Sequence, residues 1–130
     1  VGWNDALPLR YAVQLNGVSS IMLNKLDVLS GIPEILLCVA YEIDGKRVER
    51  WPSSTAELSR ATPIYERFPG WSEPIHNVRA LADLPENARR YVTALEELAG
   101  APIVLLSVGP ERTQTIERAW RPMRRSVNRP

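Results

Sequence analysis

The sequence contains one cysteine and one histidine, and each scarcity excludes a kind of chemistry. Cys38 alone cannot form an internal disulfide or a cysteine-based zinc site. Because it lies within an apolar run, we expect it to be a small buried hydrophobe. His76 lies in a Pro-Ile-His-Asn segment and is expected to be an exposed loop residue. The sequence therefore indicates neither a Ser-His-Asp arrangement nor a metal-ligand cluster.

Other features are missing as well. The seven glycines form no glycine-rich loop with a lysine, so the β- and γ-phosphates of a nucleotide have no evident binding loop. No stretch approaches the roughly 20 consecutive apolar residues of a transmembrane helix. No charged-then-apolar leader precedes the body, so neither membrane insertion nor secretion is expected. The chain starts at Val1, within the approach to a predicted helix, and this suggests a fragment or a processed piece.

What remains is the composition of one ordinary globular domain. With 130 residues, of which 45% are hydrophobic and 24% charged, the chain can bury a single core. Its charges are unevenly placed, because all 15 acidic residues lie at or before Glu117. Residues 1–117 therefore carry a net charge of −4, from 11 basic and 15 acidic side chains. An acidic body does not match a nucleic-acid surface, so we expect no nucleic-acid partner.

The segment 118–130 differs from the body in composition. It holds five basic residues, two prolines and no acidic residue, and it has no periodicity, which is typical of disorder. We therefore divide the chain into a folded part, 1–117, and a basic disordered tail, 118–130. A short nucleic-acid-binding arm is the alternative for the tail.

Two amphipathic helices are predicted. The first ends near Asn16, with Asn4 or Asp5 as its cap and Gly17 as its stop. The second covers residues 84–99 and is clearer, because a capping box, a proline in the first turn and a following glycine mark its ends. These markers are Asp83 with Glu86, Pro85, and Gly100.

Apolar strands alternate with these helices. The near-continuous apolar run 35–41 is typical of a strand buried on both faces, and Asp44-Gly45 after it predicts a type I′ hairpin. Further predicted elements are strands at 18–23 and 103–106, a short helix at 54–60 and a loop at 68–71. The alternation predicts an α/β fold, with a largely parallel sheet, flanking helices and a β-hairpin, similar to part of a P-loop NTPase.

The run Asn24-Lys25-Leu26-Asp27 directly follows a predicted strand, and Asn-Lys-x-Asp is the pattern by which GTP-binding proteins select guanine. Guanine presents two adjacent donors, N1–H and the 2-amino group, and the carboxylate of Asp27 can accept both. Charge-assisted bonds of this kind contribute roughly 1.5–3 kcal/mol each, enough for about hundredfold discrimination against adenine. Lys25 can lay its aliphatic stem across the base, and Asn24 can brace the loop.

The run Ser107-Val108-Gly109-Pro110 follows the strand at 103–106 in the same way. Ligands of parallel sheets bind at the carboxyl ends of the strands, so we expect the two polar runs to share one edge. Backbone N–H groups at the turn of Gly109 are candidate donors to guanine O6. The alternative is a pair of solvated turns in a structural α/β domain.

Six segments together resemble the adenylosuccinate synthetase family. The likeness runs in order from Gly2 to about Ile116, roughly nine tenths of this chain, and covers only the C-terminal third or so of that enzyme. The family usually has Thr where this chain has Asn24, and a bulky apolar residue where it has Asn4. The segments are Gly2-Trp3-Asn4-Asp5-Ala6, Asn24 to Gly31, Cys38-Val39-Ala40-Tyr41, Pro69-Gly70-Trp71-Ser72-Glu73, Leu84-Pro85-Glu86-Asn87-Ala88 and Ser107-Val108-Gly109-Pro110.

The resemblance implies a GTP-dependent, Mg²⁺-requiring ligase that joins IMP and L-aspartate to form adenylosuccinate in AMP biosynthesis, as a cytoplasmic homodimer. In the family, the residues matching Lys25 and Asp27 contact guanine, and those matching Ser107 and Gly109 close around the base. Together with Asn24 they form the expected GTP-binding set.

No catalytic or Mg²⁺-binding residue is expected in this chain. The family's catalytic Asp and His belong to its N-terminal region, and its arginine-rich L-aspartate loop would end just before Val1. We therefore expect the isolated chain to be inactive as a ligase. A non-catalytic module that binds a guanine nucleotide or a partner protein is the alternative.

Overall fold

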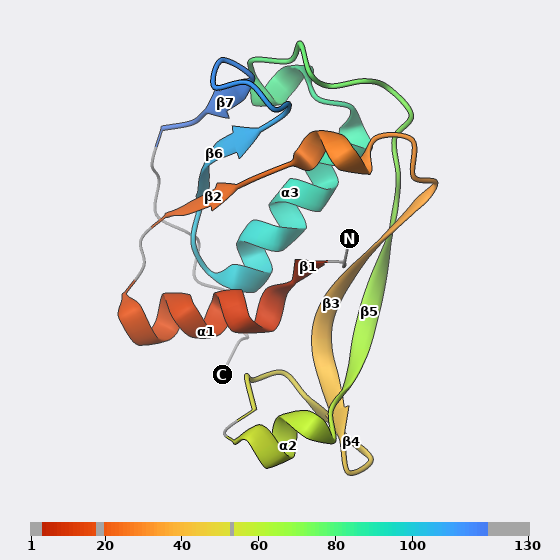
Figure 1. Ribbon diagram of the computed structural model, residues 1–130, viewed down its shortest axis with the longest axis vertical. Helices are drawn as coiled ribbons and strands as arrows, with labels where there is room; N and C mark the ends of the chain where they lie inside the picture. The colour runs from red at the N-terminus through yellow and green to blue at the C-terminus, as the bar shows by residue number, and fades with distance from the viewer. Residues whose placement is uncertain (1–3, 18–19, 53, 120–130) are drawn as a thin grey trace.

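The computed structural model describes residues 4–17, 20–52 and 54–119, so part of the strand expected at 18–23 and most of the expected tail lie outside the described residues. Figure 1 shows an upper part built from α3 and short strands, and a long two-stranded ribbon that extends below it. The elements in chain order are β1 (Asn4–Asp5), α1 (Ala6–Asn16), β2 (Ile21–Leu23), the 3₁₀ helix η1 (Leu26–Leu29), β3 (Glu34–Ile43), β4 (Lys46–Val48), α2 (Thr55–Ser59), β5 (Thr62–Pro69), the 3₁₀ helix η2 (Leu81–Asp83), α3 (Glu86–Ala99), β6 (Ile103–Ser107) and β7 (Thr115–Glu117).

Helix α1 begins and ends as its sequence predicts. Asp5 is the cap, because its Oδ1 accepts a hydrogen bond from the Leu7 N–H at 2.9 Å. The second carboxylate oxygen of Asp5 accepts the hydroxyl of Tyr41, which ties the start of the helix to β3. Gly17 ends the helix in the left-handed conformation, with φ of 63°.

Strand β3 is the centre of the first sheet. It pairs antiparallel with β5 along nearly its whole length, and on its other side it pairs parallel with β1 and antiparallel with β4. Asp44 and Gly45, between β3 and β4, both have positive φ, 53° and 79°, as a type I′ turn requires. The hairpin prediction is therefore confirmed.

The second sheet places β6 between β2, which is parallel to it, and β7, which is antiparallel. Its apolar side chains join those of β3 and α3 in one core cluster. The amphipathic character predicted for the helix at 84–99 is confirmed, because Tyr91, Val92 and Leu95 of α3 are each at most 2% exposed. In this way α3 shares one core with both sheets, and its Glu96 binds the Ile103 N–H at the start of β6.

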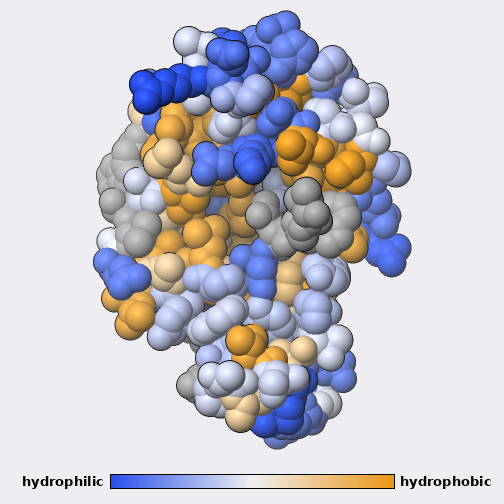
Figure 2. All heavy atoms as spheres, viewed as in Figure 1, coloured by the Kyte–Doolittle hydropathy of each residue, from blue (hydrophilic) through white to orange (hydrophobic). Residues whose placement is uncertain are grey.

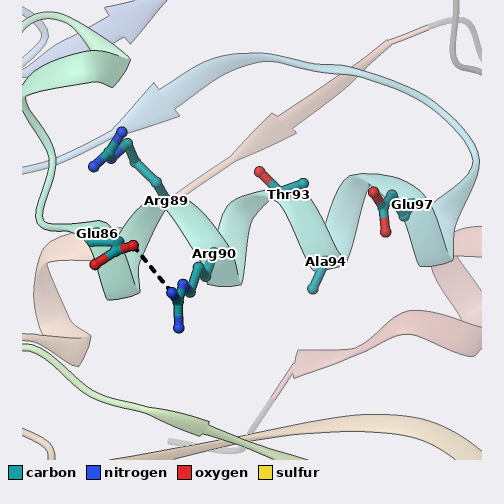
Figure 3. A pocket seen from close by; sticks show the side chains of 6 residues that line it. All are labelled: Glu86, Arg89, Arg90, Thr93, Ala94 and Glu97. Carbon is teal, nitrogen blue, oxygen red and sulfur yellow. Dashed lines mark hydrogen bonds and ion pairs between the residues drawn. The ribbon is translucent and has the colours of Figure 1, made fainter.

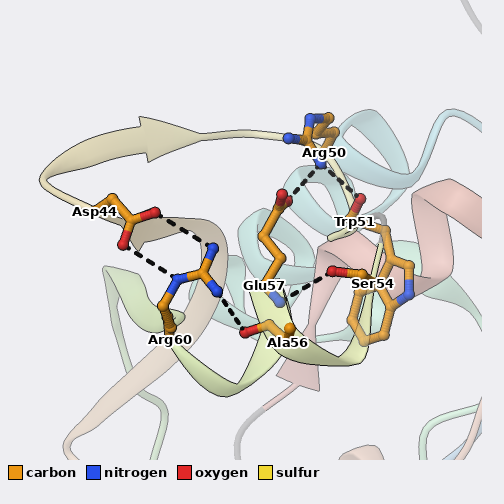
Figure 4. A network of polar contacts seen from close by, with 7 residues as sticks. All are labelled: Asp44, Arg50, Trp51, Ser54, Ala56, Glu57 and Arg60. Carbon is orange, nitrogen blue, oxygen red and sulfur yellow. Dashed lines mark hydrogen bonds and ion pairs between the residues drawn. The ribbon is translucent and has the colours of Figure 1, made fainter.

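At the lower end of the molecule, hydrogen bonds and ion pairs surround the short helix α2 (Figure 4). Ser54 caps this short helix by accepting the Glu57 N–H, which confirms the helix predicted at 54–60. Arg50 pairs with Glu57 at 2.8 Å, and Arg60 pairs with Asp44 at 3.2 Å. Ion pairs as exposed as that of Arg60 contribute little to stability, so we regard this network as local bracing.

The α/β class is confirmed, but the sheet is not largely parallel. Only β1 with β3 and β2 with β6 run parallel among the described strands, while β3–β4, β3–β5 and β6–β7 are antiparallel. The two-residue turn between β3 and β4 allows only an antiparallel pair, since a parallel pair needs a crossover of roughly a dozen or more residues. The structure therefore contains two small mixed sheets.

Strand β5 lies outside the predicted elements, and the loop expected at 68–71 begins only at Gly70. Phe68 and Pro69 are the last two residues of β5. The strand lacks a hydrophobic alternation, and it contains a proline near each end, at Pro63 and Pro69. Its conformation comes from pairing with β3, a long-range effect that local patterns do not encode.

The start of α3 also differs from the prediction. Asp83 does not cap it, because Asp83 belongs to η2 and the helix begins at Glu86, after Pro85, without a side-chain cap. Pro85, predicted to lie in the first turn, is instead the N-cap residue just before the helix, with φ of −51° and ψ of 145°. The predicted stop at Gly100 is confirmed, with φ of 82°.

Arg118, expected to be the first residue of a disordered tail, is instead part of the folded body. Its N–H donates to the Val104 carbonyl at 2.8 Å, and its guanidinium pairs with Glu96 at 3.1 Å. The guanidinium also donates to the Ile103 carbonyl at 3.0 Å. Sequence composition misassigned Arg118 because the partner carboxylate lies on α3, far away in the chain.

Two apolar side chains on β2 and in the turn after it are exposed. Met22 and Val28 are 62% and 50% exposed, and Figure 2 shows hydrophobic surface on the upper part of the face that carries β2. β2 pairs with β6 on one side only among the described strands.

No helix in the described ranges is long and apolar enough to cross a membrane.

Cys38 is buried, as expected, and its thiol lies at 3.4 Å from the Ala40 carbonyl. Burial, and secondarily the neighbouring charge of Asp5, raise the pKa of Cys38 to about 11. Burial and the bond to Asp5 also raise the pKa of Tyr41. Both groups are therefore held neutral in the folded chain at a pH at which they ionise when unfolded.

We expect the free energy of unfolding to fall as the pH rises from about 9 to 11. Over this range the unfolded Cys38 thiol ionises near its ordinary pKa of 9.0, whereas the folded thiol stays protonated up to about 11. Urea denaturation across this range would show the fall, and Cys38→Ala should flatten its first part. Equal pH dependence in both proteins would contradict this assignment.

Candidate functional site

The two predicted polar runs meet at one edge of the second sheet. β2 and β6 are parallel neighbours, and Leu23 is paired with Leu106. Asn24 and Ser107 are the next residues of the two strands, so the runs that they begin leave the sheet side by side. The expectation that both lie at the carboxyl ends of adjacent parallel strands is confirmed.

The first turn leaves the sheet through an unusual backbone conformation. Lys25 has φ of 61°, in the left-handed region, where a residue with a side chain costs roughly 1–2 kcal/mol. This conformation ends β2 and starts η1, and the side chain of Leu26, 1% exposed, anchors the turn in the core. Asn24 and Lys25 are exposed and Asp27 is half-buried. Such local strain is typical of functional turns.

The polar side chains of this turn form no hydrogen bonds or ion pairs within the described part of the chain, so they remain available to a ligand. No hydrogen bond or ion pair joins the side chains of Asn24, Lys25 or Asp27 to another described residue. The Asn24 side chain, predicted to brace the loop, therefore makes no hydrogen bond that would do so within the described residues. The backbone does the bracing, because the Ser30 N–H donates to the Asp27 carbonyl at 3.1 Å.

The second turn is held by Gln114, which sequence analysis missed. Its carbonyl accepts the Val108 N–H at 2.8 Å, and its side-chain Oε1 accepts the Glu111 N–H at 3.0 Å. A Cβ on Gly109 would lie 2.3 Å from that same Oε1, so a larger residue there would displace the end of the Gln114 side chain and its bond to Glu111. The Ser107 hydroxyl donates to the Gly109 carbonyl at 3.1 Å and closes the turn.

These two turns offer complementary chemistry. Asp27 presents a carboxylate acceptor, while the Gly109 N–H donates to no residue in the described ranges. A planar heterocycle with donors on one edge and a carbonyl on another matches such a pair. No three His, Cys, Asp or Glu side chains gather as candidate metal ligands within residues 4–17, 20–52 and 54–119.

Two surface hollows lie away from these turns. One, of about 370 Å³, follows the outer face of α3, where the exposed Glu86–Arg90 pair spans 3.1 Å (Figure 3). The other, of about 570 Å³, lies between Arg10 of α1, the end of the hairpin and Leu98. The arginines lining the second include Arg47, which is already paired with Glu49 at 3.0 Å. Neither hollow includes a predicted site residue.

The fold and this edge define an α/β protein with a candidate nucleotide-base site at the carboxyl ends of two parallel strands. The family model described as adenylosuccinate synthetase matches residues 1–116. The chain belongs to the adenylosuccinate synthetase family, and the resemblance seen in its six segments is confirmed.

Individual relatives agree. The chain is 54% identical over 116 residues to the adenylosuccinate synthetase of Streptomyces coelicolor, covering 89% of this chain and 27% of the relative. It is 48% identical over 122 residues to that of Streptococcus gordonii, covering 92% and 28%. The chain thus spans little more than a quarter of the length of the curated relatives that it matches.

A solved structure shows the same fold. The structure of the fully ligated adenylosuccinate synthetase from Plasmodium falciparum superposes with a TM-score of 0.85 at 39% identity. The match covers 91% of this chain and 29% of that chain. The arrangement of strands and turns described above is therefore similar to part of that solved structure.

Proposed function

We propose that this chain recognises the guanine base within a GTP-dependent ligase that joins IMP and L-aspartate to form adenylosuccinate. The observation that carries the proposal is the pairing of Leu23 with Leu106, which brings the Asp27 turn beside the Gly109 turn. Membership of the family supports the same role. Because the chain spans about 27% of its curated relatives, we assign it base recognition and no step of the ligation.

Each site residue has a distinct role in this proposal. The carboxylate of Asp27 accepts N1–H and the 2-amino group of guanine, a charge-assisted pair of bonds that adenine cannot make. The stem of Lys25 covers one face of the base. The Gly109 N–H donates to O6, and Ser107 keeps the turn closed through its bond to the Gly109 carbonyl. Asn24 lines the start of the first turn.

The remaining expectations concern the whole enzyme. IMP, L-aspartate, Mg²⁺, the homodimer and the cytoplasmic location belong to the proposed ligase. We assign this chain base recognition and no part in binding Mg²⁺. We keep the proposed division into a folded base-recognition part and a basic tail, but Arg118 joins the folded part.

Binding of GDP and ADP to the full chain tests the proposal. We expect weak binding that favours GDP by about a hundredfold, since two charge-assisted bonds distinguish the bases. Saturation-transfer NMR and calorimetry would measure it. Asp27→Ala should remove the preference, and Asp83→Ala, which changes an exposed carboxylate in η2, should leave it unchanged. Equal affinity of the unmodified chain for GDP and ADP would refute the proposal.

A further inference from the structure

A set of hydrogen bonds joins the end of the Asp27 turn to a distant loop. The indole N–H of Trp71 donates to the Ser30 hydroxyl at 2.8 Å, and that hydroxyl donates to the Glu73 carbonyl at 3.1 Å. The Gly31 N–H donates to the Trp71 carbonyl at 2.8 Å. We name these four residues, Ser30, Gly31, Trp71 and Glu73, the turn clamp. Neither strand pairing nor helix formation requires these bonds.

The loop side of the clamp is rigidly held. Trp71 is 4% exposed and lies against Tyr91 of α3, with 6.4 Å between the ring centroids. The Gly70 carbonyl accepts from the Asn87 side chain at 2.9 Å. At Gly70 a Cβ would lie 1.8 Å from the Ile32 carbonyl oxygen, so the two segments touch through their backbones. The clamp therefore fixes the turn to α3.

The turn side of the clamp leads directly to Asp27. Ser30 donates its N–H to the Asp27 carbonyl at 3.1 Å, across one 3₁₀ turn. Bonds within a 3₁₀ helix have poor geometry, and a single turn of this kind is not stable by itself. The Asp27 side chain has no bond to another described residue that would aim it. The direction of its carboxylate is consequently set by the backbone that Ser30 holds.

We propose that Ser30 and Trp71 are positioning residues for base recognition, which hold the Asp27 carboxylate in line with the two donors of guanine. The inference rests on the proposed function. It assigns a role to an indole N–H that donates to a hydroxyl, and to a hydroxyl that donates to a backbone carbonyl. Ser30→Ala and Trp71→Phe each remove the hydrogen bond between them, and the second also leaves a small cavity in the core.

The test compares GDP with inosine diphosphate, which lacks only the 2-amino group. The full chain is expected to favour GDP by about tenfold or more, the contribution of one charge-assisted bond. Ser30→Ala and Trp71→Phe should each reduce this ratio to less than about threefold, while Ser30→Thr, which keeps the hydroxyl, should retain it. Ser59→Ala removes a comparable hydroxyl in α2 and is the matched control.

The ratio separates positioning from stability. A merely structural role would weaken GDP and inosine diphosphate by the same factor and leave the ratio intact, and that result would overturn the inference. Suppose that the unmodified chain favours GDP and that Asp27→Ala abolishes this preference. An unchanged ratio of GDP affinity to inosine diphosphate affinity in Ser30→Ala and Trp71→Phe would then refute the positioning role but not the proposed function. If the unmodified chain shows no preference, the proposed function fails, and this inference fails with it.

Discussion

Replacing Asp27 with Asn is expected to move the base preference from GDP to xanthosine diphosphate. Xanthine keeps N1–H but carries a carbonyl where guanine has its 2-amino group. In the Asp27→Asn variant, the oxygen of the new side-chain amide accepts N1–H, and its NH₂ group donates to that carbonyl. Facing guanine, the same NH₂ group would meet the 2-amino donor without an acceptor between them. The amide therefore suits xanthine and opposes guanine.

The expected size follows from the number of bonds that change. GDP loses at least one charge-assisted bond, worth roughly 1.5–3 kcal/mol, and xanthosine diphosphate gains a neutral one of about 1 kcal/mol. The ratio of the two affinities, measured by calorimetry, should thus shift by about a hundredfold or more in Asp27→Asn. Asp27→Ala is the control, because it should lose the preference for GDP without acquiring one for xanthosine diphosphate. An unchanged order of affinities in Asp27→Asn would show that Asp27 does not read the base.

The parts of this site that sequence predicts are local. Lys25 and Asp27 belong to a four-residue pattern at the end of an apolar strand, and Gly109 follows another such strand, so strand ends and polar runs suffice to find them. The turn clamp is different in kind. Ser30 and Trp71 are separated by 41 positions and meet only because β3 and β5 pair between them. No spacing within either segment encodes that meeting.

In the fold, too, local features were predictable from the sequence and features that depend on long-range pairing were not. The hairpin at Asp44-Gly45 and the end of α1 at Gly17 were predictable, because each depends on the backbone freedom of a glycine or of its neighbour. β5 and β7 were not, since both are short of apolar alternation and owe their conformation to a partner strand. The role of Gln114 was not predictable either, because it depends on the loop folding back over Gly109 and not on a local sequence pattern.

The second large expected effect is a loss of stability on replacement of Arg118, the residue that the sequence assigned to the tail. Glu96 is 1% exposed, and its carboxylate accepts the Ile103 N–H at 2.7 Å as well as the Arg118 guanidinium at 3.1 Å. The arginine side chain is itself only 15% exposed. A buried ion pair is costly to form, but the removal of one member is costlier still, because the remaining charge stays in a poorly solvated position.

Arg118→Ala is therefore expected to lower the free energy of unfolding by about 3 kcal/mol and the Tm by roughly 10 °C. Urea and thermal denaturation followed by circular dichroism would measure both. Arg112→Ala, at an exposed arginine before β7, is the control and should change stability by less than about 0.5 kcal/mol. If Arg118→Ala is as harmless as this control, residue 118 belongs to the tail after all. A large loss instead places the boundary of the folded part after Arg118, because the charge that neutralises Glu96 is then required for the fold.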